Sequence, residues 1–134
     1  MEPRSGEPFV LDSSVWVALF IDEDSSHAQA AAIIDEIVAH IYVPYIVLSE
    51  VATVITNKYS KQQADKFLTF VSGDGRCIPV DNRYATDVQA FLDCREPISF
   101  PDISIVTFAL QYGLKLITFD RKMRSFFLRC NNRV

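Results

Sequence analysis

Cysteine, histidine, glycine and long apolar runs are all scarce in this sequence of 134 residues. Cys77, Cys94 and Cys130 form no Cys-x-x-Cys pair, and neither of the 2 histidines stands beside a cysteine. This spacing disfavours a zinc site or a disulfide framework and favours a reducing cytoplasm. The longest apolar run, Val15 to Ile21, has seven residues, whereas a helix that spans a membrane needs about 20. We therefore expect a cytoplasmic protein with no membrane span.

The first eight residues, Met1 to Pro8, are polar and lack the apolar core of a signal peptide. We expect a flexible lead-in over residues 1–8 and no export. The remaining sequence has what a packed core requires, since 49% of all residues are hydrophobic and the net charge is only −4. These values exclude a mainly disordered chain and predict a single domain over residues 1–134.

Charge is distributed unevenly along the chain. Residues 1–40 carry eight acids and one base, whereas residues 115–134 carry six bases and one acid. The acidic total argues against a protein that holds nucleic acid by bulk electrostatics alone. Within the basic segment, Arg121, Lys122 and Arg124 are candidates for contact with a substrate phosphate. The alternative is that they form an ordinary solvated surface.

Short apolar strands alternate with helical patterns along the whole sequence. We expect strands at Phe9–Leu11, Ile41–Val43, Cys77–Val80, Leu114–Thr118 and Phe126–Cys130. Helices are expected at Ser14–Phe20 (capped by Ser13 or Ser14), Ala30–Val38, Tyr45–Lys58, Lys61–Val71, Tyr84–Leu92 and Pro101–Tyr112. The proline at position 79 predicts that its strand lies at a sheet edge. This alternation predicts a three-layer α/β/α fold around a central, mostly parallel sheet of about five strands.

Two acids stand where predicted strands end. Asp12 closes Phe9–Asp12, and Asp120 closes the strand that begins at Leu114. Ligands of open parallel sheets bind outside the carboxyl ends of the strands. A single acid at such a place is usually a helix cap or a turn residue. Two acids at one edge make a functional interpretation more attractive.

Two further acids lie on predicted helices. Glu50 falls beside Val51 on the apolar stripe of its helix, where an unpaired carboxylate would be costly. It is either a functional group or an acid at the edge of the stripe that pairs with Lys58 or another surface base. Asp102 follows Pro101 in the first turn of its helix, where acids are favoured by the helix dipole and Ser99 suggests a capping box. Taken alone, Asp102 would not be singled out.

The four acids occur in an ordered set of short motifs. The motifs are Asp12-Ser-Ser14, Val43-Pro-x4-Ser-Glu50-Val-Ala, Phe100-Pro-Asp102-Ile-Ser-Ile and Leu116-Ile-Thr118-Phe-Asp120. Together they resemble PIN-domain ribonucleases, and most closely the VapC-type toxins of toxin–antitoxin pairs. The resemblance covers about Phe9 to Arg129. The lead-in of eight residues and the ending from Arg129 to Val134 depart from the family's pattern.

This resemblance implies an acidic site in which Asp12, Glu50, Asp102 and Asp120 are the catalytic, metal-binding acids. Ser14 and Thr118 match the family's supporting hydroxyl positions. Oxygen ligands suit Mg²⁺ or Mn²⁺, and such an ion can polarise a phosphate and activate water for RNA hydrolysis.

The resemblance also implies an RNA substrate, a cognate antitoxin protein and a homodimer. Trp16, Phe20, Phe126 and Phe127 are candidate interface residues, with core packing as the alternative for each.

Other classes of function compete with this interpretation. A non-catalytic PIN-like interaction or RNA-binding module is the main alternative, and the presence of all four acids argues against it. A haloacid-dehalogenase phosphatase would need a second aspartate where this sequence has Ser14, and a receiver domain would need an acidic pair before Asp12. The sequence contains neither Gly-x4-Gly-Lys-[Ser/Thr] nor Gly-x-Gly-x-x-Gly, so nucleotide-binding enzymes are disfavoured.

Overall fold

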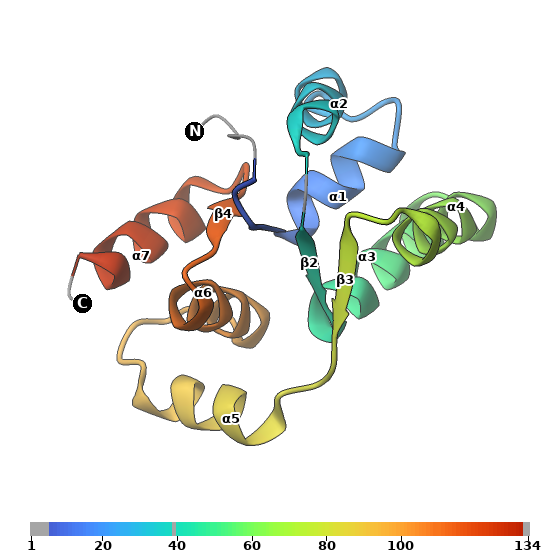
Figure 1. The fold of residues 1–134 in the computed structure, drawn as a ribbon. Helices are drawn as coiled ribbons and strands as arrows, with labels where there is room; N and C mark the ends of the chain where they lie inside the picture. Colours follow the sequence, from blue (N-terminus) through green and yellow to red (C-terminus); the bar gives the residue numbers. More distant parts are fainter. Residues whose placement is uncertain (1–5, 39, 133–134) are drawn as a thin grey trace.

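A computed structural model describes residues 6–38 and 40–132 of the chain. In these residues four parallel strands alternate with seven helices (Figure 1). The elements in chain order are β1 (Phe9–Leu11), α1 (Ser13–Phe20), α2 (His27–Glu36), β2 (Ile41–Pro44), α3 (Tyr45–Lys58), α4 (Lys61–Gly73), β3 (Cys77–Val80), α5 (Tyr84–Asp93), α6 (Phe100–Tyr112), β4 (Lys115–Ile117) and α7 (Arg121–Asn131). The predicted α/β/α class is confirmed, with four strands in place of about five.

The strand order β3-β2-β1-β4 places the first strand in the middle of the sheet. On one side β1 pairs with β2, and on the other side it pairs with β4, where Leu11 lies opposite Ile117. All three pairings are parallel. The carboxyl ends of β1 and β4 are therefore neighbours, which brings the segments that follow these two strands to one place.

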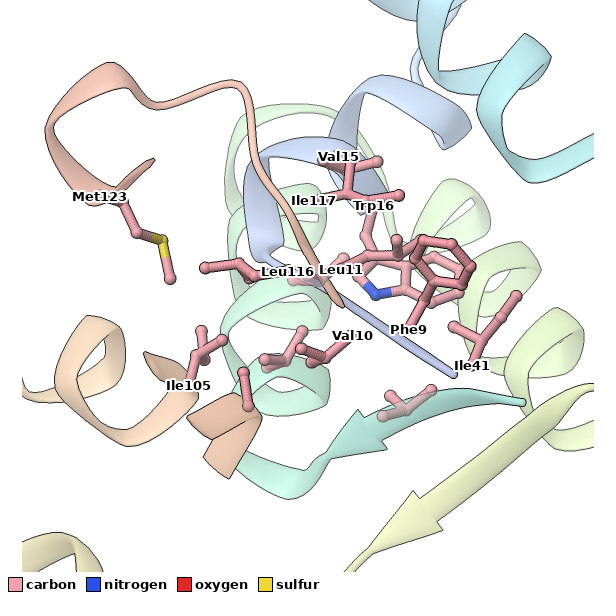
Figure 2. Close-up of a cluster of buried hydrophobic side chains, with 14 of the residues drawn as sticks. Phe9, Val10, Leu11, Val15, Trp16, Ile41, Ile105, Leu116, Ile117 and Met123 are labelled. Carbon is pink, nitrogen blue, oxygen red and sulfur yellow. The ribbon is translucent and has the colours of Figure 1, made fainter. Parts of the chain in front are cut away.

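Helices cover the central strand from both sides. Figure 1 shows α5 and α6 on one side of the sheet and α1, α3 and α4 on the other. The three residues of β1 are completely buried, as expected for a parallel strand inside a three-layer fold. Figure 2 shows Val10 on the same side of β1 as Ile105 of α6, and Phe9 on the same side as Trp16 of α1.

The sheet edge at β3 is protected in a way that the sequence predicted. Pro79 lies in this strand, which pairs only with β2 within the described sheet. A proline has no N–H to offer to a further strand, and edge strands are where proline is tolerated. The N–H of Cys77 already donates to the carbonyl of Asp74 at 3.0 Å. The prediction of an edge position is confirmed.

The fifth strand expected at Phe126–Cys130 was wrong, because this segment belongs to helix α7. Asp120 caps the helix, since its carboxylate accepts hydrogen bonds from two backbone N–H groups of the first turn. Met123, Phe126 and Phe127 are buried and lie three and four residues apart, which is the spacing of one helical face.

The start of α1 also differs from the expectation. Asp12, and neither Ser13 nor Ser14, is the residue that caps this helix. For the four candidate interface aromatics, the structure favours the alternative of core packing, with three of them buried and Phe20 partly buried against the core. Trp16, Phe126 and Phe127 are buried, and Phe20 packs edge-to-face on two rings of α4.

Part of the predicted lead-in, residues 1–5, lies outside the described residues. At its other end, the carbonyl of Pro8 accepts a hydrogen bond from the N–H of Lys115 at 3.1 Å. This bond extends the pairing of β1 with β4. Among the described residues, no helix has the length and apolar character needed to cross a membrane.

Candidate active site

Asp12 is the most enclosed acid of the candidate site. It follows β1 directly, and its side chain is fixed by groups of the first turn of α1. The Oδ1 atom of Asp12 accepts hydrogen bonds from the Ser14 N–H at 2.9 Å, the Ser14 hydroxyl at 2.5 Å and the Val15 N–H at 3.4 Å. The Oδ2 atom accepts one from the hydroxyl of Thr118. Oδ1 is saturated by these donors, whereas Oδ2 retains a lone pair for a further partner.

Thr118 links Asp12 to the second strand-end acid. Its Oγ1 atom, which donates to Asp12, accepts a hydrogen bond from the N–H of Asp120 at 3.0 Å. The neighbouring N–H of Phe119 donates to the hydroxyl of Ser14 at 3.2 Å. The two hydroxyls thus tie the end of β1 to the segment after β4. These contacts place Asp12, Ser14, Thr118 and Asp120 in one cluster.

Burial makes the charge of Asp12 costly. The residue is 4% exposed, and desolvation raises the pKa of its carboxyl above the ordinary value, although the hydrogen bonds from Ser14, Thr118 and Val15 act in the opposite direction. An ionised Asp12 is therefore a group that would gain from a nearby cation.

Asp102 lies in the first turn of α6 and is half-buried. The hydroxyl of Ser99 caps this helix by accepting a hydrogen bond from the N–H of Asp102 at 3.3 Å. Burial raises the pKa of the Asp102 carboxyl, and the charge of Asp120 adds to this rise, whereas Ser99 and the charge of Lys122 lower the pKa. Asp102 and Asp120 are thus close enough to repel each other. This repulsion extends the cluster to a third acid.

Glu50 lies in the second turn of α3, which begins where β2 ends. Its side chain is half-buried, and it forms no hydrogen bond or ion pair with any residue that the structure describes. The predicted pairing with Lys58 is therefore absent from the described contacts. Helix α3 contacts both α1 and α6. One turn after Glu50, Val54 borders a hollow of about 350 Å³ that Ser14 and Phe119 also line.

The described residues contain no group of three or more histidine, cysteine, aspartate or glutamate side chains arranged to hold a metal ion. A direct cage of four carboxylates is therefore not what these side chains form. Mg²⁺ usually takes one or two carboxylates directly and keeps several waters. The oxygen donors Asp12, Asp102 and Asp120 suit such a cation in type and charge, and the assignment of all four acids as ligands stays a prediction.

The three basic residues proposed for phosphate contact differ in their surroundings. All three are exposed and lie at the start of α7. The guanidinium of Arg124 already has a partner within the protein, because its Nη2 atom donates a hydrogen bond to the carbonyl of Thr118 at 2.6 Å. Lys122 donates its backbone N–H to Oδ1 of Asp120 at 2.9 Å, and its charge slightly opposes the rise in the pKa of Asp102. Arg121 forms no side-chain hydrogen bond or ion pair with the described residues.

A buried acid that the sequence analysis missed is Asp87 of α5, which is 5% exposed. Its Oδ2 atom accepts a hydrogen bond from the hydroxyl of Ser104 of α6 at 2.7 Å. Its Oδ1 atom and Nη1 of Arg83 are both buried without a hydrogen-bond partner, and the two residues line one cavity of about 10 Å³. The signal in the sequence was the spacing of Asp87 with Ala90, which lies three residues later on the same helix.

Comparison with known proteins agrees with this architecture. The chain belongs to the PIN domain family, whose family model matches residues 9–126. A solved structure with the same fold is that of VapC20 from Mycobacterium tuberculosis, described as a sarcin-ricin loop cleaving toxin. The superposition has a TM-score of 0.77 at 16% sequence identity and covers 87% of this chain and 93% of VapC20. No curated protein sequence matches the chain.

Proposed function

We propose that this protein is a metal-dependent endoribonuclease and the toxin of a toxin–antitoxin pair. The observation that carries the proposal is the hydrogen-bonded cluster of Asp12, Thr118 and Asp120 at the carboxyl ends of β1 and β4. The charge of Asp120 also acts on Asp102, which adds a third acid to the candidate site. The cluster lies within a chain of the PIN domain family. The likeness to VapC20, a sarcin-ricin loop cleaving toxin, supports RNA as the substrate.

The donor set fits Mg²⁺ or Mn²⁺, which prefer oxygen ligands. Asp12, through the free lone pair of its Oδ2 atom, and the nearby Asp102 and Asp120 would hold the ion, with Glu50 as the fourth predicted ligand. When bound, the ion polarises the scissile phosphate and lowers the pKa of a water molecule. No cysteine, histidine or serine nucleophile is required.

The chain's own residues have separable tasks in this proposal. Ser14 and Thr118 hold Asp12 in a single orientation, because they donate to its two different oxygens. Thr118 also fixes the backbone of Asp120. Asp102 adds charge from another helix. This arrangement is organised before substrate binds, which is how positioned charges contribute most to catalysis.

We also propose a cognate antitoxin and a homodimer as partners, in a cytoplasmic setting. Of the interface residues suggested by the sequence, Trp16, Phe126 and Phe127 are buried and Phe20 is partly buried against the core, so a second copy would need a different surface. Exposed apolar side chains occur on α3, α5 and the start of α6 at Tyr45, Tyr84, Phe91, Leu92 and Phe100. Exposed aromatic and aliphatic residues of this kind are enriched at the centres of interfaces, and we propose this surface for the homodimer.

Cleavage of total cellular RNA by the purified protein tests the proposed function. We expect cleavage with Mg²⁺ or Mn²⁺, none with EDTA, and loss of cleavage in Asp102→Asn. Asp93→Asn, which changes an exposed aspartate at the end of α5, serves as the matched control. Cleavage that persists in EDTA or in Asp102→Asn would reject the proposal.

The alternative is a module that binds RNA or protein without cleaving RNA. It predicts RNA binding that is unaffected by Asp102→Asn and no cleavage under any metal condition. Growth arrest on induction provides a second measure, because a catalytic toxin loses its toxicity in Asp12→Asn and Asp102→Asn.

A further inference from the structure

We propose that Lys122 binds a phosphate of the RNA next to the cleavage site. This inference rests on the proposed ribonuclease function and adds a residue that contacts substrate. It selects one of three adjacent basic residues whose surroundings differ.

The position of Lys122 is fixed relative to the acids by consecutive hydrogen bonds. Its backbone N–H donates to Oδ1 of Asp120 at 2.9 Å, and the N–H of Asp120 donates to Oγ1 of Thr118 at 3.0 Å. The Thr118 hydroxyl donates in turn to Asp12. The first turn of α7 is therefore anchored to the most buried acid of the site. A side chain that starts from this turn has a defined place at the rim.

The ammonium group of Lys122 remains available to a ligand. The side chain is exposed, and it forms no ion pair with a carboxylate of the described residues. The pKa of Asp102 is raised overall by burial, and the positive charge of Lys122 opposes only a small part of this rise. The backbone of Lys122 is bound to Asp120, whereas its exposed side chain forms no ion pair with a described acid.

The charge balance of the site favours such a residue. Thr118 links Asp12 to the backbone of Asp120, and the charge of Asp120 acts on Asp102. An RNA strand brings further negative charge to these acids. Like charges at short range repel strongly in partly buried surroundings, so a cation at the rim offsets part of this repulsion when a phosphate approaches. Lysine binds phosphate as a point charge and needs no fixed geometry.

Arg124 is not equivalent to Lys122. Its guanidinium donates to the carbonyl of Thr118 at 2.6 Å, so this side chain supports the segment that carries Asp120. A loss of activity in Arg124→Gln would therefore report on the shape of the site. Lys122→Gln removes a charge without removing a described contact, which makes it the cleaner variant.

RNA binding in the Asp102→Asn background is the first test, with a fluorescent single-stranded RNA of mixed sequence as the probe. Removal of one phosphate contact should reduce the slope of log affinity against log salt by about 0.7. We expect this reduction in Lys122→Gln and recovery of the slope in Lys122→Arg. The control is Lys66→Gln on α4, an exposed lysine on a helix that Figure 1 places across the molecule from α7. Equal slopes for Lys122→Gln and Lys66→Gln would overturn the inference.

Steady-state cleavage by otherwise unaltered protein is the second test. Removal of a contact that is equally strong in the ground state and the transition state raises KM and leaves kcat unchanged. We expect Lys122→Gln to raise KM about tenfold, which corresponds to about 1.4 kcal/mol, and Lys122→Arg to restore most of it. A lower kcat at unchanged KM contradicts a binding role. Failure of the wild type to cleave RNA would reject the proposed function, whereas the salt slopes would still decide whether Lys122 contacts RNA.

Discussion

The hydroxyl of Thr118 donates a hydrogen bond to Asp12, although the two residues are 106 positions apart in the sequence. The contact exists because β1 and β4 are parallel neighbours in a register that sets Leu11 opposite Ile117. One residue further along each strand, the two side chains meet. The same hydroxyl accepts the N–H of Asp120 at 3.0 Å, so one small side chain connects two of the predicted metal-binding acids.

Thr118→Val should lower ribonuclease activity about 10- to 100-fold, as is typical when a group that orients a metal ligand is removed. The change retains the shape of the side chain and leaves Oδ2 of Asp12 and the N–H of Asp120 without a partner. Stability should also fall by about 1–3 kcal/mol, measured by urea unfolding. Thr118→Ser keeps the hydroxyl and should retain most of the activity. Equal activity of the Val and Ser variants would show that the hydroxyl has no supporting role.

Asp12→Asn should reduce activity at least about 100-fold, because several kcal/mol of charge stabilisation depend on the metal that this residue is proposed to hold. In EDTA at neutral pH, the same variant should be at least as stable as the wild type. The pKa of Asp12 is raised by burial, so its ionised form opposes folding above that pKa, and the penalty disappears as the pH falls through it.

The stability advantage of Asp12→Asn should therefore shrink on acidification. Thermal unfolding at several pH values in EDTA measures this trend. A variant that is much less stable than the wild type at neutral pH would mean that the hydrogen bonds to Asp12 outweigh the cost of its charge.

Mg²⁺ or Mn²⁺ should stabilise the wild-type protein. Binding to the folded state alone contributes about 2.7 kcal/mol at a hundredfold excess over the dissociation constant. The gain should be reduced in Asp12→Asn and in Asp102→Asn, and it should be unchanged in Asp93→Asn. Calorimetric melting with metal and with EDTA measures it, and identical melting curves would contradict a metal site.

Arg76→Lys should destabilise the fold by about 1.5–3 kcal/mol, since several hydrogen bonds of a charged group are lost. Arg76 donates from Nη1 to the carbonyls of Ile34 and Ile37, both at 2.8 Å, and from Nη2 to Oδ2 of Asp74 at 2.9 Å. It therefore joins the end of α2 to the turn before β3. Arg95→Lys, at an exposed arginine, is the control in urea unfolding.

The effect of Arg76→Lys should depend on pH with a defined sign. The hydrogen bond from Arg76 lowers the pKa of Asp74 from its ordinary 3.8. The stabilisation is complete above the unfolded-state value and is lost as the pH falls through the lower folded-state value. The difference between wild type and variant should thus persist at neutral pH and narrow in strong acid. A difference that widens in acid would contradict this assignment.

Ser104→Ala should cost about 1–3 kcal/mol, because it leaves the buried carboxylate of Asp87 without a partner on either oxygen. In the double variant with Asp87→Asn the cost should be less than the sum of the two single changes. A double-mutant cycle from urea unfolding measures this coupling. Strict additivity would mean that the hydrogen bond between α5 and α6 contributes nothing. The cavity shared with Arg83 is about 10 Å³, close to the space that one bridging water needs.

The layered fold could be predicted because strands such as Phe9–Leu11 are uniformly apolar and the helices between them are amphipathic. The end of the chain was mispredicted because Phe126, Phe127 and Leu128 are consecutive and favour a strand locally. The segment is helical because Asp120 caps its first turn and because Met123 is buried on the same face as Phe126 and Phe127. This burial depends on the tertiary fold, which the local sequence does not reveal.

The sequence indicated which residues belong to the candidate site, but it did not indicate the hydrogen bonds between them. Strand ends pointed to Asp12 and Asp120, and the structure joins them through Thr118. Which oxygen accepts which donor depends on strand register and side-chain rotamer, and neither is encoded by spacing. The negative charge of Asp120 raises the pKa of Asp102, which relates these two acids. The role of Glu50 stays a prediction. Asp87 escaped notice because an acid in the first turn of a helix is commonplace.

Asp12 and Asp120 each begin a helix with the same carboxylate that is proposed to hold metal. A substitution at either position that removes the carboxylate therefore affects metal binding and the stability of the helix at the same time. Asparagine and serine also begin helices well, whereas alanine does not. A descendant that abandoned RNA cleavage and kept only its partner-binding role would be expected to drift to asparagine or serine at these two sites and to avoid alanine.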